Sequence, residues 1–195
     1  MSNSDQRLTG VILAGGQGSR MGGMDKGLQE FRGKSLVAWA RERILPQIDE
    51  LLINANRNIA AYGALGHRVI TDSSPDHLGP LAGLRSALAA AAHERIIAVP
   101  CDTPHLPLDL AMRLRRAAEL EAADVAVAVT GMQVHPVFLY CHRDTLAELD
   151  AYLAGGGRKM ETWLANLRVA KVHFDDQPEA FVNLNSIEDL RHAES

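Results

Sequence analysis

Short apolar runs and longer amphipathic segments alternate along the chain as far as residue 129. The runs are rich in Val, Ile and Leu and end at polar residues or glycine, which is typical of buried strands. They lie at Thr9–Leu13, Glu50–Asn54, His67–Thr71, Arg95–Pro100 and Asp124–Val129. Helical spacing occurs at Leu36–Ile44, Pro80–Ala92 and Leu108–Ala122. The alternation predicts a parallel sheet between helices, because parallel strands need crossover connections.

The pattern changes after Thr130. A strand at His135–Tyr140 follows a turn at Gly131 too closely for a crossover helix, so the sheet is expected to be mixed. Two helical segments, an alternating edge strand and a helix start then follow at Asp144–Leu153, Lys159–Leu167, Val169–Phe174 and Ser186. We predict an α/β fold with a Rossmann-like open, mostly parallel (mixed) sheet and helices on both faces. No repeat or linker divides the chain, so residues 1–195 form one predicted domain.

The composition fits a globular protein without a nucleic-acid partner. The 195 residues are 47% hydrophobic and carry a net charge of −4, which argues against disorder and against non-specific binding to DNA or RNA. Cys101 and Cys141 have neither zinc nor disulfide spacing. The first ten residues lack the apolar core of a signal peptide, and charges interrupt the longest apolar region, Leu81–Pro100. We therefore expect a cytoplasmic protein with no membrane partner.

A glycine-rich loop leaves the carboxyl end of the first predicted strand. Between Leu13 and Lys26 the chain holds five glycines, and Arg20 and Lys26 add two positive charges. Glycine lets the backbone approach a ligand and turn its N–H groups toward phosphate oxygens. The loop is not a P-loop, because Gly27 follows Lys26, and it is not a dinucleotide loop, because position 21 is Met. It predicts a triphosphate site, with a turn carrying solvated charges as the plainer alternative.

Three other predicted strands place polar residues at the same edge of the sheet. Asp102 follows the strand at Arg95–Pro100, and one carboxylate there suits Mg2+ bound together with phosphate oxygens, although a helix cap is the alternative. Asn54 and Asp72 end two further strands and face the same crevice, while Asp72 alternatively starts a turn. The helix that opens at Pro80 offers a second anion site or ordinary helix initiation.

The second part of the chain supplies candidates for a second ligand. Asn183 and Asn185 are two residues apart on an extended segment, so their side chains project from one face. His135 and the pair Arg158 and Lys159 offer a polar contact and two cations. A turn histidine and a solvated helix start are the alternatives for these three residues.

Five motifs together carry a resemblance to a known family. They are LAGGQGSRMGGMDKG at 13–27, NANR at 54–57, GPLAG at 79–83, PCDTP at 100–104 and FVNLN at 181–185. The first motif resembles nucleotidyltransferases that activate sugars, polyols and cofactors. The whole set, in this order, resembles the molybdenum cofactor guanylyltransferases of the MobA family and covers almost the whole chain.

The resemblance implies a nucleotidyltransferase-type fold, with a GTP-binding half at 8–129 and a molybdopterin-binding half at 130–195. The implied reaction transfers GMP from GTP to the terminal phosphate of Mo-molybdopterin and releases pyrophosphate. Catalysis is assigned to Arg20, Lys26 and Asp102, with Mg2+ on Asp102. GTP binding is assigned to Leu13, Ala14, Gly15, Gly16, Lys26, Asn54, Asp72 and Asp102, and acceptor binding to Pro80, Leu81, His135, Arg158, Lys159, Asn183 and Asn185.

Two alternatives stay open at this point. One is a related cytidylyl-, sugar- or polyol-phosphate nucleotidyltransferase, which a nucleotide panel would distinguish. The other is a non-catalytic adaptor that binds GTP and delivers the cofactor, although Arg20, Lys26 and Asp102 together favour catalysis. We further expect a monomer whose protein partners are a molybdate-insertion enzyme and molybdoenzyme chaperones.

Overall fold

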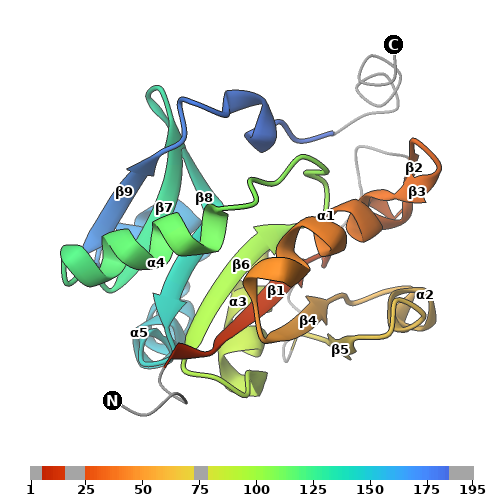
Figure 1. Ribbon diagram of the computed structural model, residues 1–195. Helices are drawn as coiled ribbons and strands as arrows, with labels where there is room; N and C mark the ends of the chain where they lie inside the picture. Colours follow the sequence, from red (N-terminus) through yellow and green to blue (C-terminus); the bar gives the residue numbers. More distant parts are fainter. Residues whose placement is uncertain (1–5, 16–24, 73–78, 185–195) are drawn as a thin grey trace.

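A mixed seven-stranded sheet dominates the computed structural model, which describes residues 6–15, 25–72 and 79–184. Within these residues the strands are β1 (Leu8–Leu13), β4 (Glu50–Asn54), β5 (Arg68–Ile70), β6 (Arg95–Pro100), β7 (Val125–Thr130), β8 (Gln133–His142) and β9 (Val169–His173). Their order is β5-β4-β1-β6-β8-β7-β9, and among them only β8 runs antiparallel to its neighbours (Figure 1). The predicted open, mostly parallel sheet is confirmed.

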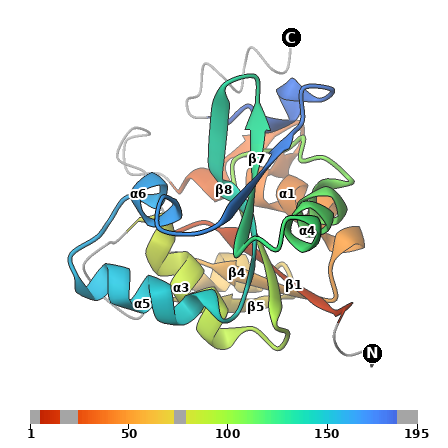
Figure 2. The same ribbon diagram turned by 90° about the vertical axis from the view of Figure 1, so that its left-hand side faces the viewer.

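Helices cover both faces of the sheet, as predicted (Figure 2). One face carries α1 (Leu36–Ile44) and α4 (Leu110–Leu120), and the other carries α3 (Pro80–Ala90), α5 (Thr145–Ala154) and α6 (Met160–Leu164). The short helix α2 (Ile59–Gly63) follows β4. Smaller elements are the 3-10 turns η3 (Lys26–Leu28), η4 (Leu45–Gln47) and η5 (Pro178–Phe181) and the hairpin of β2 (Glu30–Phe31) and β3 (Lys34–Ser35).

The apolar runs form central strands because both faces of the sheet are buried. Side chains alternate along a strand, so in β1 Ile12 enters the core beneath α1 and α4, while Val11 and Leu13 enter the core beneath α3. Ala126 and Val127 divide in the same way in β7. The strands are packed on both faces, which fixes the positions of their ends. The polar residues at and after these ends are therefore held in place.

The structure changes the predicted elements where they are short. The helix expected at Lys159–Leu167 is confined to α6, because the amides of Asn166 and Leu167 bond three residues back and turn the chain toward β9. Neither α2 nor the hairpin of β2 and β3 is predicted by the periodicity. The helix start expected at Ser186 lies outside the described residues.

The proposed division into halves at residue 130 stays a prediction. The strand β8 belongs to the second half, yet it lies between β6 and β7 of the first. Among the residues that the structure describes, no helix is long and apolar enough to cross a membrane.

Candidate active site

The carboxyl ends of three parallel strands meet at one edge of the sheet. Leu13 pairs in register with Asn54 on one side and with Pro100 on the other. The amide of Ala14 donates to the carbonyl of Asn54 at 2.8 Å, and the amide of Cys101 donates to the carbonyl of Leu13 at 3.2 Å. The strand order reverses at β1, which is where an open α/β sheet forms a ligand crevice. The residues that follow these strands therefore share one site, as predicted.

A closed hydrogen-bond cluster stands at the ends of β4 and β5. The carboxylate of Asp72 accepts hydrogen bonds from Nδ2 of Asn54 at 2.8 Å and from Nδ2 of Asn56 at 2.7 Å. The amide of Asp72 donates to Oδ1 of Asn56 at 2.9 Å. Asn54 is only 2% exposed. Both carboxylate oxygens are thus fixed in place, and the structure brings together the predicted Asn54 and Asp72.

Asn56 is a member of this cluster that the residue-level prediction missed. It lies two residues after Asn54, so the spacing argument that selected Asn183 and Asn185 applies equally to this pair. The motif at 54–57 contained the signal.

Two glycines allow the chain to approach this cluster closely. A Cβ atom on Gly83 would lie 2.4 Å from Oδ1 of Asn54 and 2.9 Å from a methyl carbon of Leu13. A Cβ atom on Gly15 would lie 3.0 Å from both Oδ1 of Asn54 and Nδ2 of Asn56. The predicted Gly15 therefore lies directly on the cluster, and Gly83 lets the first turns of α3 rest against β1 and β4.

The predicted residues at the start of α3 differ in exposure. Pro80 is exposed, whereas the side chain of Leu81 is fully buried in the core beneath α3. Leu81 as a whole residue is 0% exposed, so a contact of Leu81 with a ligand stays a prediction. The helix begins after Gly79, whose φ of +67° favours glycine.

Lys26 and Asp102 form an ion pair across the site. Lys26 begins η3 and its Nζ contacts Oδ2 of Asp102, with exposed side-chain fractions of 23% and 10%. Asp102 does not cap a helix: α4 begins at Leu110 and its N-cap residue is Asp109. The helix-cap alternative is therefore wrong. The predicted Gly16 and Arg20 lie outside the described residues.

The donor set around Asp102 fits a metal ion that arrives with its own ligands. Among the described residues no three His, Cys, Asp or Glu side chains gather to hold an ion. Mg2+ is usually bound by one or two carboxylates together with phosphate oxygens and water. The nearly buried carboxylate of Asp102 matches that pattern, with Lys26 beside it as a second positive charge.

The C-terminal segment returns to the same site. The amide of Leu184 donates to the carbonyl of Asp102 at 3.0 Å, and Oγ1 of Thr103 donates to Oδ1 of Asn183 at 3.0 Å. Asn183, predicted from the second half, is thereby held next to the Asp102 turn. The predicted Asn185 lies outside the described residues.

His135 is buried beneath this returning segment. It is 8% exposed, its Nε2 lies 2.7 Å from Oγ1 of Thr130, and its ring stacks on Phe181 at 4.9 Å between centroids. Phe181 ends η5, two residues before Asn183. The structure therefore shows His135 supporting the segment that carries Asn183. A direct contact with a ligand stays a prediction.

Burial lowers the pKa of His135, which predicts a loss of stability in acid. The unfolded chain gains a proton near pH 6.5, whereas the folded chain resists protonation until a lower pH. Stability is therefore unaffected above about pH 7 and falls as the pH drops below about 6.5. His135→Gln is expected to lose less stability between pH 8 and pH 5.5 than the wild type, measured by urea unfolding. Equal losses of stability in the two proteins would contradict this prediction. Burial also lowers the pKa values of His67 and His105, but both residues are present in the wild type and in the variant, so the difference between the two proteins reports His135.

The predicted Arg158 and Lys159 lie between the end of α5 and the start of α6. Nη1 of Arg158 donates to the carbonyls of Leu153 at 3.1 Å and Gly157 at 2.6 Å, which terminates α5. Lys159 is the N-cap residue of α6, and its carbonyl accepts a hydrogen bond from the hydroxyl of Tyr152. Lys159 matches the plainer interpretation of a helix start, whereas the guanidinium of Arg158 bonds the end of α5 instead. Acceptor binding by Arg158 and Lys159 stays a prediction.

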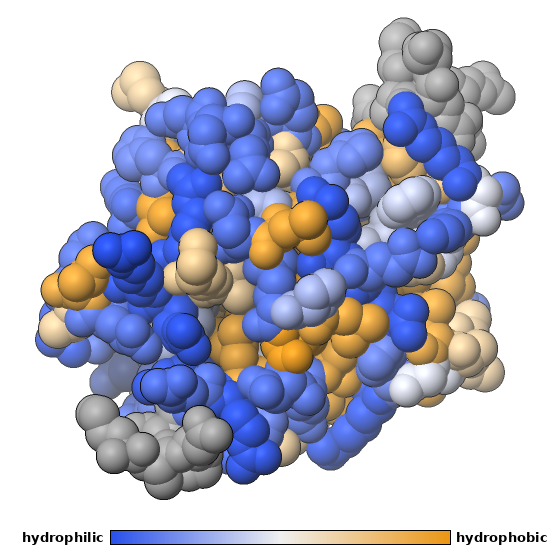
Figure 3. Space-filling view, viewed as in Figure 1, coloured by the Kyte–Doolittle hydropathy of each residue, from blue (hydrophilic) through white to orange (hydrophobic). Residues whose placement is uncertain are grey.

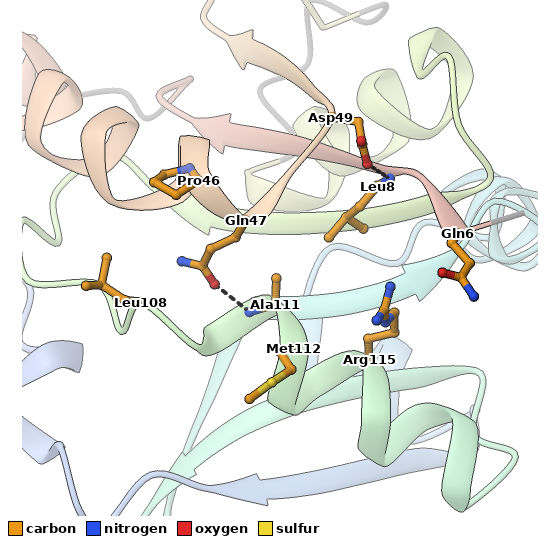
Figure 4. Close-up of a pocket in the computed structure, with 9 residues that line it drawn as sticks. All are labelled: Gln6, Leu8, Pro46, Gln47, Asp49, Leu108, Ala111, Met112 and Arg115. Atoms are coloured by element: carbon orange, nitrogen blue, oxygen red, sulfur yellow. Dashed lines mark hydrogen bonds between the residues drawn. The ribbon is translucent and has the colours of Figure 1, made fainter. Parts of the chain in front are cut away.

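A groove of about 250 Å3 lies at the opposite edge of the sheet, near the start of β1 (Figure 4). There Oε1 of Gln47 accepts a hydrogen bond from the amide of Ala111 at 2.9 Å, and Asp49 accepts one from the amide of Leu8 at 2.8 Å. Leu8 begins β1, so this groove is separate from the site at the strand ends. Gln47 joins η4 to α4, and apolar groups gather near the middle of this face of the molecule, bordered by hydrophilic ones (Figure 3).

A family model described as a MobA-like NTP transferase domain matches residues 10–171. The chain belongs to this family. The molybdenum cofactor guanylyltransferase of Cupriavidus necator is 49% identical over 193 residues, which cover 96% of each chain. The protein of the same name from Ralstonia pickettii is 46% identical over 192 residues, 94% of each chain. The predicted family and the predicted class of enzyme, a nucleotidyltransferase, are confirmed.

Two solved structures share the fold of this chain. Molybdopterin-guanine dinucleotide biosynthesis protein A from Archaeoglobus fulgidus superposes with a TM-score of 0.78 at 24% identity, covering 95% of this chain and 96% of its own. The 4-diphosphocytidyl-2C-methyl-D-erythritol synthase of Anaerococcus prevotii has a TM-score of 0.71 at 14% identity, covering 97% of both chains. The nucleotidyltransferase-type fold is thus confirmed.

Proposed function

We propose that this MobA-like protein transfers GMP from GTP to the terminal phosphate of Mo-molybdopterin. The products are the molybdopterin guanine dinucleotide cofactor and pyrophosphate. Relatives named molybdenum cofactor guanylyltransferase, similar over 96% of the chain, support the proposal. The structural observation that carries it is the placement of Lys26 and Asp102 together, with Asn183 held beside them through Thr103.

The Asn54–Asn56–Asp72 cluster is proposed to bind the guanosine part of GTP, together with Leu13, Ala14 and Gly15. Each oxygen of the Asp72 carboxylate has room for more than one hydrogen bond, so a base edge can join the cluster. A rigid polar pocket discriminates between bases because a wrong base leaves buried donors or acceptors unpaired.

The transfer itself needs alignment and charge neutralisation. A terminal phosphate oxygen of the acceptor attacks the α-phosphorus of GTP, and the bond from that phosphorus to the bridging oxygen of pyrophosphate breaks. The attacking phosphate is already ionised, so no general base is required. Lys26 binds the triphosphate and the departing pyrophosphate, with Gly16 and Arg20 contributing from the same loop. Held by Asp102, Mg2+ would supply further charge neutralisation at the phosphates.

The acceptor is proposed to lie on the side of Asn183. Its proposed surroundings are completed by Pro80, Leu81, His135, Arg158, Lys159 and Asn185. Asn183 shares a hydrogen bond with Thr103, which directly follows Asp102. An acceptor bound at Asn183 is therefore next to the proposed metal ligand.

The test is a pyrophosphate-release assay with molybdopterin, Mg2+ and each of the four nucleoside triphosphates. Release with GTP well above release with ATP, CTP or UTP is expected. Preference for CTP would replace the proposal with cytidylyl transfer. Binding of both ligands without pyrophosphate release would favour the non-catalytic adaptor.

A further inference from the structure

Asp25, the residue before Lys26, is held by a segment outside the proposed substrate contacts. Its Oδ1 accepts a hydrogen bond from the hydroxyl of Tyr62 at 2.5 Å, and its Oδ2 accepts one from Nδ2 of Asn58 at 3.0 Å. Its carbonyl also accepts hydrogen bonds from the amide of Leu28 and from Nε2 of Gln29, both at 3.2 Å. Asp25 is therefore fixed through both its side chain and its backbone.

Tyr62 also contacts the residues that follow Lys26 and precede Asp102. Its side chain is fully buried. A Cβ atom on Gly27 would lie 2.5 Å from the Tyr62 hydroxyl oxygen and 3.3 Å from Sγ of Cys101. Only glycine fits at position 27, because any larger residue would displace the phenol or the turn. The phenol thus lies close to both segments that bring Lys26 and Asp102 together.

The electrostatic surroundings keep the Tyr62 hydroxyl protonated. Burial, followed by the neighbouring Cys101 and the hydrogen bond to Asp25, raises the pKa of Tyr62 far above its ordinary value. The hydroxyl therefore remains a donor to the Asp25 carboxylate at every pH at which the protein would be assayed. A hydrogen bond to a charged acceptor is stronger than one between neutral groups.

The second donor comes from a backbone geometry suited to asparagine. Asn58 has φ of +50° and ψ of +34°, in the left-handed region that asparagine tolerates better than most residues. It directly precedes α2, which carries Tyr62. One short stretch between β4 and β5 therefore supplies both donors to Asp25.

We propose that Tyr62 and Asn58 are positioning residues for Lys26, acting through Asp25. A lysine side chain has four rotatable bonds, and ordering it on a triphosphate costs entropy. A backbone fixed on both sides of Lys26 leaves only the side chain to be ordered. Small misplacements of groups that align a substrate lower turnover strongly. This inference rests on the proposed function, since it takes Lys26 as the cation that binds the triphosphate.

The experiment is a double-mutant cycle of Tyr62→Phe and Lys26→Ala, read out as GTP affinity by calorimetry and as kcat/KM for pyrophosphate release. Tyr62→Phe removes one oxygen and keeps the buried ring. It is expected to lower kcat/KM about tenfold when Lys26 is present and less than about twofold when Lys26 is alanine. A merely structural role for the hydroxyl would give the same loss in both backgrounds, and that additivity would overturn the proposal.

A second test variant and a control variant complete the experiment. Asn58→Gly keeps the left-handed backbone accessible but removes the amide, and its effect is also expected to disappear when Lys26 is alanine. Tyr140→Phe is the matched control, because Tyr140 is a buried tyrosine of β8 that is hydrogen-bonded to Arg95. It is expected to leave kcat/KM unchanged. A loss in the control equal to that of Tyr62→Phe would also overturn the proposal.

Failure of the proposed function gives a different pattern. A wild-type protein that binds GTP but releases no pyrophosphate would contradict the proposed reaction, while the cycle measured on GTP affinity would still test the positioning. A wild-type protein that binds none of the four nucleoside triphosphates would overturn both. Turnover with additive variants would overturn the positioning alone.

Discussion

Asp102→Ala is expected to lower kcat for pyrophosphate release by about 10²–10³-fold while GTP affinity falls far less. The carboxylate is the proposed ligand of Mg2+ and the partner of Lys26. Its loss therefore weakens the neutralisation of negative charge at the reacting phosphates. The guanosine contacts at Asn54, Asn56 and Asp72 remain intact. The measurement is steady-state kinetics over a range of Mg2+ concentrations, together with calorimetric titration of GTP.

Asp102→Asn separates charge from packing in the same experiment. It keeps the size of the side chain, which is 10% exposed, but weakens its hold on a cation. Its kcat is expected to fall nearly as far as that of the alanine variant, with a shift of the Mg2+ dependence to higher concentration. Turnover within about threefold of the wild type in both variants would exclude the metal role.

The sequence predicts the central architecture because burial on both faces leaves a clear pattern. The strands at Glu50–Asn54 and Arg95–Pro100 and the helix at Leu36–Ile44 have the predicted bounds. The helix α2 leaves no such pattern, because five residues are fewer than two helical turns and a residue in the left-handed region precedes them. The helix α2 holds Asp25 through Tyr62, which is 37 residues from Asp25 in the sequence and approaches it only in the folded chain.

The site residues likewise fall into those that the sequence could predict and those that it could not. Residues at or just beyond the end of a strand, such as Asn54 and Asp102, were predictable, because the sheet fixes their position. Thr103 was not selected, because its importance comes from a partner 80 residues away in the chain. Asn56 was missed although its spacing from Asn54 contained the signal. The orientation of a long side chain such as Arg158 could not be predicted from the sequence either, because it depends on which carbonyl groups α5 leaves unpaired.

Lys26→Ala is expected to weaken GTP binding by about tenfold to a hundredfold and to lower kcat as well. The lysine is the proposed contact of both the bound triphosphate and the departing pyrophosphate, so it acts in the ground state and in the transition state. Its removal also leaves the nearly buried Asp102 without its cation. That costs stability, by less than the roughly 3–5 kcal/mol of a fully buried pair because Lys26 is 23% exposed.

Comparison of ligands separates the phosphate role of Lys26 from general damage. Affinity for GTP is expected to fall in Lys26→Ala while affinity for guanosine, which lacks phosphates, stays at the wild-type value. Lys26→Arg keeps the charge but replaces a compact ammonium by a larger planar group, so partial recovery of GTP affinity with low kcat is expected. The Asn54–Asn56–Asp72 cluster is untouched in all these proteins and serves as the internal reference. Equal losses for guanosine and GTP would show that Lys26 supports the fold of the nucleotide site rather than the triphosphate.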